Sequence, residues 1–278
     1  MTPHCPLGIL DANTLEELAR VICGDEHLYY RKGYEIARFL EHAGWQRVPE
    51  YDGEYRREWA LARLCIRTSV TRFRNAVEAA DGLVDADGKV RADQSDLSSH
   101  CTWDEKPQRA KCEVLEQLGR GWHQIEDFYS HSNWTDRAAP GPIGLENPPG
   151  LGRTEVAPFL DMGRYSGMKD ADWTRDARTL IPVGLTTGCY TDVDSTGVKP
   201  ADCDGRVSHN RALNKDTAAS ARSKPDDNFR HATAGATAEI TRQWNDFKAD
   251  LLKTYPDHGR GAQMICALVH DDPAGACP

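Results

Sequence analysis

The sequence lacks several features that would assign the chain to a familiar class at once. No run of residues approaches the ~20 consecutive apolar residues that a membrane-spanning helix needs. Basic residues are in the minority, with 34 Lys and Arg against 43 Asp and Glu, so the formal net charge is −9. A protein that binds polyanions without specificity presents a basic face. The acidic balance argues against that class, although a bound metal ion can reverse the local charge and still admit a phosphate.

Common catalytic signatures are missing as well. The chain contains no Cys-x-x-Cys pair, which weakens thioredoxin-like and zinc-ribbon interpretations. It has no Gly-x-Ser-x-Gly nucleophile motif and no glycine-rich phosphate loop. Hydrolytic chemistry in this chain would therefore need a source other than an activated serine.

Cysteine, in contrast, is abundant. Nine cysteines in 278 residues indicate an oxidising compartment with structural disulfides. Close spacing favours three pairs, Cys101–Cys112, Cys189–Cys203 and Cys266–Cys277, and leaves the partners of Cys5, Cys23 and Cys65 open. We expect a secreted or extracytoplasmic protein. Its signal peptide would be absent from this sequence, because MTPHCPLGIL has no basic start followed by an apolar run.

Helical periodicity dominates both ends of the chain. Apolar residues recur at spacings of three and four over 54–80 and 227–254, and a further helix is expected from Pro107 to about Trp134. Shorter helices are expected over 14–23, 25–43 and 261–270.

The middle of the chain, residues 135–207, is rich in proline and glycine. It predicts an irregular insert, pinned by Cys189–Cys203 and containing short strands around Thr179 to Tyr190. Because the insert lies between helices that look like packing partners, we expect one mainly α domain over 1–278, a helical bundle.

The segment with the strongest chemical pattern is the expected helix around His123, Asp127 and His131. These residues stand at i, i+4 and i+8, so all three share one helical face. His123 and Asp127 can ligate one metal ion and Asp127 and His131 a second, with the carboxylate bridging; this donor set suits zinc. A surface helix whose polar side carries two histidines would have the same spacing. The opposite face carries an apolar stripe of Leu115, Leu118, Trp122, Ile125 and Tyr129.

Two segments carry a resemblance. Residues 122–134, Trp-His-Gln-Ile-Glu-Asp-Phe-Tyr-Ser-His-Ser-Asn-Trp, resemble the H-x-x-x-D-F-x-x-H-S-N segment of the fungal heterokaryon-incompatibility Het-C family and its bacterial relatives. Residues 208–216, Ser-His-Asn-Arg-Ala-Leu-Asn-Lys-Asp, resemble the H-x-x-x-L-N-K-D segment that follows in those relatives. The relatives look like distant members of the zinc-dependent phospholipase C / P1 nuclease superfamily. The resemblance implies a helical bundle of that type.

Carried over residue by residue, the resemblance implies a cluster of one to three zinc ions. Its ligands would be His123, Asp127, His131, His209, His27 and His100, with Asp96 as a catalytic carboxylate that accepts a proton from water. Asn133 and Asp216 would support the ligands from outside. His27 is equally explained as a capping residue, and His100 as part of an ordinary polar loop anchored by Cys101.

The sequence departs from the superfamily pattern at two ligand positions. Three residues separate Asp127 from His131, where phospholipase C and P1 nuclease have five. Leu213 occupies the position, four residues after His209, where relatives carry an acid. With these departures, a full three-zinc cluster does not follow from the resemblance.

Two functions follow as expectations. The first is a secreted zinc-dependent phosphodiesterase, phospholipase C-like, that acts on a phosphoester such as a phospholipid, with nucleic acid less favoured by the acidic charge. The second is a non-catalytic secreted Het-C-like scaffold or binding protein that interacts with membranes or acts in cell death. The two ordered motifs favour the enzyme, and the two departures favour the scaffold.

Overall fold

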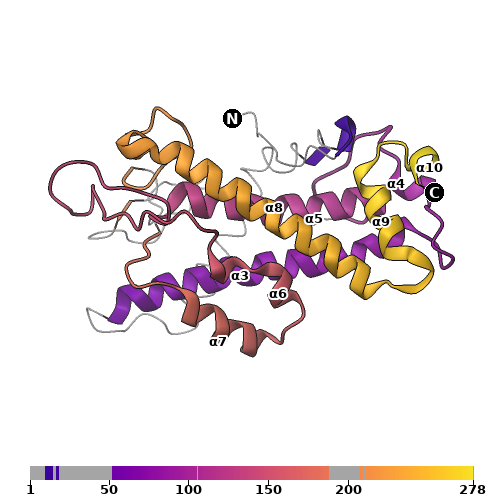
Figure 1. Cartoon of the computed structure of the whole chain (residues 1–278), viewed down its shortest axis with the longest axis horizontal. Coiled ribbons are helices and arrows are strands. Elements are labelled where there is room, and N and C mark those ends of the chain that lie inside the picture. Colours follow the sequence, from indigo (N-terminus) through magenta and orange to yellow (C-terminus); the bar gives the residue numbers. More distant parts are fainter. Residues whose placement is uncertain are drawn as a thin grey trace.

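Three long helices form the framework of the computed structural model. They are α3 (Asp52–Ala79), α5 (Ala110–His131) and α8 (Asn228–Thr254), and α5 packs against both of the others (Figure 1). The structure describes residues 10–14, 17–18, 52–104, 106–187, 207–208 and 211–277, and the side chains of these except 52–65 and 274. Within this part of the chain no helix is long and apolar enough to cross a bilayer. The prediction of a mainly α fold is confirmed.

Short helices complete the described part. They are η1 (Ala80–Leu83), α4 (Ala92–Ser95), η2 (Pro158–Leu160), α6 (Met162–Ser166), α7 (Asp170–Leu180), η3 (Ala221–Ser223), η4 (Pro225–Asp227), η5 (Asp257–Gly259), α9 (Arg260–Val269) and α10 (Pro273–Ala276). The described residues contain isolated bridges, such as Ser132 with Thr187, but no strand. The prediction of strands from Thr179 onward is therefore wrong as far as Thr187, because Thr179 and Leu180 close α7.

The insert is more ordered than its proline and glycine content predicts. It contains η2, α6 and α7, and one arginine of α3 binds α6 and the start of α7, while η2 packs against α7. The Arg74 guanidinium of α3 donates hydrogen bonds to the carbonyls of Tyr165, Ser166 and Met168 and lies 3.2 Å from Asp170. It thereby satisfies carbonyls at the end of α6, which a helix C-terminus leaves without partners, and also pairs with the carboxylate at the start of α7.

Two of the predicted disulfides are confirmed. Cys101–Cys112 joins the loop before α5 to the first turn of that helix, and Cys266–Cys277 joins α9 to the residue after α10. Cys189–Cys203 lies outside the described residues, as do Cys5, Cys23 and the side chain of Cys65.

The core fixes which side of α5 faces outward. The apolar stripe predicted for this helix is buried throughout, and Trp122 meets Trp244 of α8 edge to face at 6.4 Å. Farther along, α8 comes close enough that a Cβ atom at Gly235 would lie 2.6 Å from the Tyr129 ring. Because α3 and α8 occupy the apolar side of α5, the side that carries His123 and Asp127 is turned away from the core, whereas His131 at the end of the helix is buried.

Candidate functional site

The outward face of α5 carries four titratable side chains. His123, Asp127 and His131 follow one another at a spacing of four residues, so they share one side of the helix. Glu126 lies three residues after His123, at the edge of the same side. The His123 Nε2 and Asp127 Oδ2 atoms lie 3.6 Å apart, and both side chains are partly exposed. One nitrogen and one oxygen donor therefore stand together in the middle of the motif.

A second nitrogen–oxygen pair joins the two motifs. His131 Nε2 lies 3.0 Å from Asp216 Oδ1, although the two residues are 85 positions apart. The His131 side chain is 9% exposed and that of Asp216 is 49% exposed, so the pair stands at the edge between core and solvent. The sequence predicts Asp216 only as an outer support, whereas the structure places its carboxylate directly against a predicted ligand.

A buried ionic network holds the second motif on the end of α5. Lys215 Nζ donates to the carbonyls of Ser132 and Leu213 at 2.8 and 2.9 Å and lies 3.0 Å from Asp136 Oδ1. Arg222 Nε donates to Asp136 Oδ2 at 2.8 Å. The side chains of Lys215, Asp136 and Arg222 are each at most 3% exposed. Since Asp216 follows Lys215 directly, this network determines where its carboxylate can reach.

Asn133 anchors the insert beside the same helix end. Its Nδ2 donates to the carbonyls of Pro149 and Gly184, and its Oδ1 accepts from Thr186 N at 2.7 Å. The residue is completely buried, so its Asn-x-Thr sequon cannot carry a glycan in the folded protein. Asn133 thus fixes the chain that leaves the motif, as an outer support would.

Glu126 is a member of this face that the sequence prediction missed. Burial raises the pKa of its carboxyl to about 7; the proximity of His123 opposes the shift and the charge of Asp127 adds to it. Its position, three residues after His123 and next to Asp127, is the signal that could have identified it.

The raised pKa of Glu126 gives the metal-free protein a specific pH dependence. Between pH 4.5 and 7 the folded carboxyl retains a proton that the unfolded chain has released, so stability falls as the pH rises. From pH 4.5 to pH 8, the free energy of unfolding of the wild type, measured by urea unfolding in chelator, should therefore fall by roughly 3 kcal/mol relative to that of Glu126→Gln. Glu146→Gln, at an exposed loop position, should follow the wild type. Parallel pH profiles for wild type and Glu126→Gln would contradict the assignment.

Asp96 and His100 lie at the opposite end of α5. His100 Nδ1 contacts Glu17 Oε1 at 2.6 Å, and the Asp96 carboxylate accepts hydrogen bonds from the Ser98 hydroxyl and amide, which hold its pKa below the usual value. The disulfide joins Cys101 to Cys112 in the first turn of α5. His123 lies about 16 Å from Cys112 along the helix axis. The structure therefore does not bring Asp96 or His100 to the His123/Asp127 face. His27 and His209 lie outside the described residues.

The described side chains supply donor pairs rather than a complete metal cluster. Among them no group of three or more His, Cys, Asp or Glu residues is arranged to hold one ion. The chain also matches no protein-family model, no curated protein and no solved structure significantly.

Proposed function

We propose that the outward face of α5 is a divalent-metal site, most suitably for zinc, and that the chain is a secreted phosphodiesterase. The observation that carries the proposal is the contact between His131 and Asp216, because it brings the two sequence motifs to one place. Two disulfides support the oxidising compartment that secretion implies.

The donor set fits zinc in chemistry. His123 and Asp127 form one nitrogen–oxygen pair, and His131 and Asp216 form another. A zinc site usually has at least three protein ligands, so each pair needs a further donor. His209 is the nearest candidate in sequence, six residues before Lys215. In the resemblance to phospholipase C and P1 nuclease, an acid is expected at the position that Leu213 occupies. Asp216 would supply the carboxylate that is missing there.

In this proposal the residues of the two motifs have different roles. His123, Asp127, His131 and Asp216 hold the metal, and the network around Lys215 keeps Asp216 in place. When bound, a divalent ion stabilises charge on phosphoryl oxygens and makes water a nucleophile at neutral pH. The remote position of Asp96 removes it from the proposed site. Glu126, whose carboxyl interacts electrostatically with both His123 and Asp127, replaces it in this proposal.

The proposal is tested by measuring metal content and hydrolysis on the same protein. Protein purified without chelator should contain zinc by elemental analysis. It should hydrolyse a soluble phosphocholine ester or a phospholipid emulsion, and single-stranded DNA is assayed beside them. Chelator should abolish the activity and added zinc should restore it. Fully metallated protein that leaves all three substrates intact would favour the non-catalytic scaffold.

A further inference from the structure

An aliphatic loop projects from the end of the molecule where α5 stops. Residues 138–147 follow His131 by only seven positions, and in Figure 1 the loop reaches past the start of α8. Eight uncharged residues, Ala-Ala-Pro-Gly-Pro-Ile-Gly-Leu, occupy 138–145 between Arg137 and Glu146. Ile143 is 59% and Leu145 45% exposed. Two large aliphatic side chains in water at one loop tip are a costly arrangement, which indicates a binding role.

A third exposed aliphatic residue lies at the base of the same loop. Val183 is 89% exposed, and its neighbour Gly184 accepts a hydrogen bond from the same Asn133 amide that binds Pro149. Within the described residues, Leu252 is the remaining large aliphatic side chain of comparable exposure, and it belongs to the last turn of α8. The exposed aliphatic residues thus gather beside the candidate site.

Internal hydrogen bonds hold the loop in shape. The Asn147 side chain accepts from Ala139 N and donates to the carbonyls of Ala139 and Pro142. Gly144 and Asn147 exchange two backbone hydrogen bonds. Arg222, from the buried network, adds a contact to Asn147 Oδ1 at 3.4 Å. The loop therefore presents its tip in a fixed position and loses little conformational freedom on binding.

The shape and size of the tip favour a lipid surface over a protein partner. A stable protein interface buries about 1,200–2,000 Å² in total, far more than two or three aliphatic side chains supply. A convex tip also needs a matching hollow in a protein, whereas the acyl boundary of a bilayer accepts apolar side chains of any shape.

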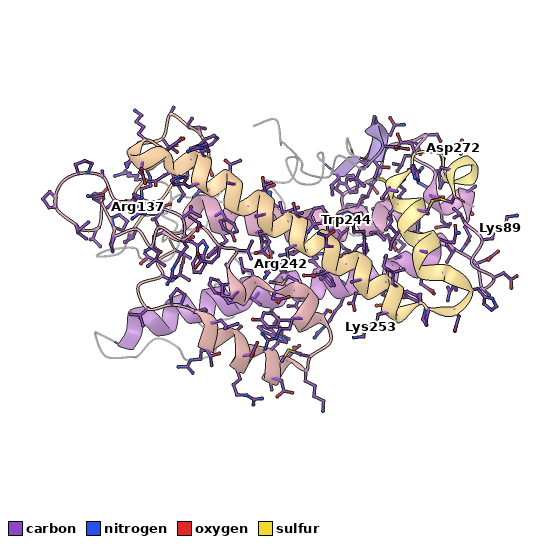
Figure 2. All side chains as sticks on the ribbon, in the orientation of Figure 1. Lys89, Arg137, Arg242, Trp244, Lys253 and Asp272 are labelled. Atoms are coloured by element: carbon purple, nitrogen blue, oxygen red, sulfur yellow. A yellow bond between two sulfur atoms is a disulfide. The ribbon has the colours of Figure 1, made fainter. Side chains whose placement is uncertain are left out.

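The charges near the loop indicate which type of lipid surface the loop can bind. Arg137, labelled in Figure 2, lies 3.4 Å from Asp226, and Arg153 lies 3.2 Å from Glu155. Arg222 is paired with Asp136, so these three cations near the loop base all have carboxylate partners. The whole chain carries a net charge of −9. Binding to anionic lipids requires an excess of basic residues near the surface. The loop is therefore suited to a zwitterionic surface.

We infer that loop 138–147 docks the protein on a zwitterionic phospholipid surface by inserting Ile143 and Leu145, with Val183 exposed at the base of the loop. The inference rests on the proposed function in one respect, since it specifies that the phosphoester is presented to the α5 face at a lipid interface. Docking itself requires no metal and no turnover.

The experiment is co-sedimentation of the full chain with phosphatidylcholine vesicles in chelator, so that it is independent of hydrolysis. Wild type should partition onto the vesicles, and Ile143→Ser/Leu145→Ser should lower the partition coefficient at least about tenfold. Leu252→Ser is the matched control, because it removes an equally exposed leucine far from the loop, and it should bind as wild type. Added phosphatidylserine should not strengthen the binding of wild type.

Several results would overturn the inference. They are no binding of wild type to phosphatidylcholine, equal binding by the double variant, or binding that requires phosphatidylserine. Light scattering without vesicles tests the competing occupant: a dimer that forms in wild type and is lost in the double variant would assign the loop to a second copy of the chain. Hydrolysis of a soluble phosphocholine ester, measured separately, tells whether the proposed function fails or stands on its own.

Discussion

Asp127→Asn is expected to lower phosphodiester hydrolysis by zinc-supplied protein by at least about 100-fold and to lower its zinc content. The substitution keeps the size and the hydrogen-bonding capacity of the side chain but removes the anionic oxygen that a divalent ion binds. Because the Asp127 side chain is 40% exposed, the variant should unfold at the same urea concentration as wild type. Activity and zinc content, measured on one preparation, check the prediction.

The matched control for this variant is Asp172→Asn. That side chain is 45% exposed, lies on helix α7 and pairs with a nearby arginine, so the same chemical change is made away from the site. It should leave zinc content and activity unchanged. If Asp127→Asn retains both zinc and activity, the α5 face is a polar surface and the metal proposal fails.

A second variant, Asp216→Asn, decides what the contact between His131 and Asp216 does. If Asp216 is a ligand, the amide should lower zinc affinity, in the same manner as Asp127→Asn. If Asp216 only orients the His131 ring through a hydrogen bond, the amide oxygen can still accept that bond and zinc content should be retained. His131 is better left intact in this comparison, because it is buried and its removal would also destabilise the fold. The burial of His131 does not fit the alternative of a surface helix that carries both histidines on its solvent side.

The long helices could be predicted because their apolar stripes are long and regular. The expected helix over 227–254 is observed as Asn228–Thr254, and that over 54–80 as Asp52–Ala79. In contrast, α7 buries only Trp173 and Ala177, which is too short a pattern to recognise among many charged residues. Its position depends on Arg74 of α3, a contact between residues about 90 positions apart, and no local pattern contains that information.

The candidate site was predictable in part for a similar reason. Spacing along one helix places His123, Asp127 and His131 on one face, because helix geometry is local. The distance of Asp96 and His100 from that face depends on how the loop before α5 folds, and Cys101–Cys112 holds it at the first turn. Nothing in the sequence marks Arg222 as a partner of Asp136, since the two residues are 86 positions apart.

Asp136→Ala is expected to lower the free energy of unfolding by about 3–5 kcal/mol, among the largest effects of any single substitution in this chain. The network contains two cations, Lys215 and Arg222, and one carboxylate, all buried. Removing the carboxylate leaves two buried positive charges without their counter-ion. Glu155→Ala is the control, because it breaks an exposed pair with Arg153 and should cost less than about 1 kcal/mol.

The network contains more cations than carboxylates, and this predicts which substitution costs more stability. Lys215→Met removes one of two cations and leaves the Arg222–Asp136 pair, so it should cost less than Asp136→Ala even though two hydrogen bonds to carbonyls are lost. Burial already lowers the pKa of Lys215, and the loss of Asp136 should lower it further. In Asp136→Ala the folded protein then binds fewer protons than the unfolded chain at alkaline pH, so part of the lost stability should return as the pH rises towards 10.

Urea unfolding of the three variants at pH 7 and pH 9.5 tests both the order and the pH effect. An equal cost for Asp136→Ala and Glu155→Ala would mean that the network is solvated rather than buried. Because the residue after Lys215 is Asp216, Asp136→Ala should also weaken zinc binding under conditions where the protein remains folded. Glu155→Ala should not, since Arg153 and Glu155 have no contact with the second motif in the described structure.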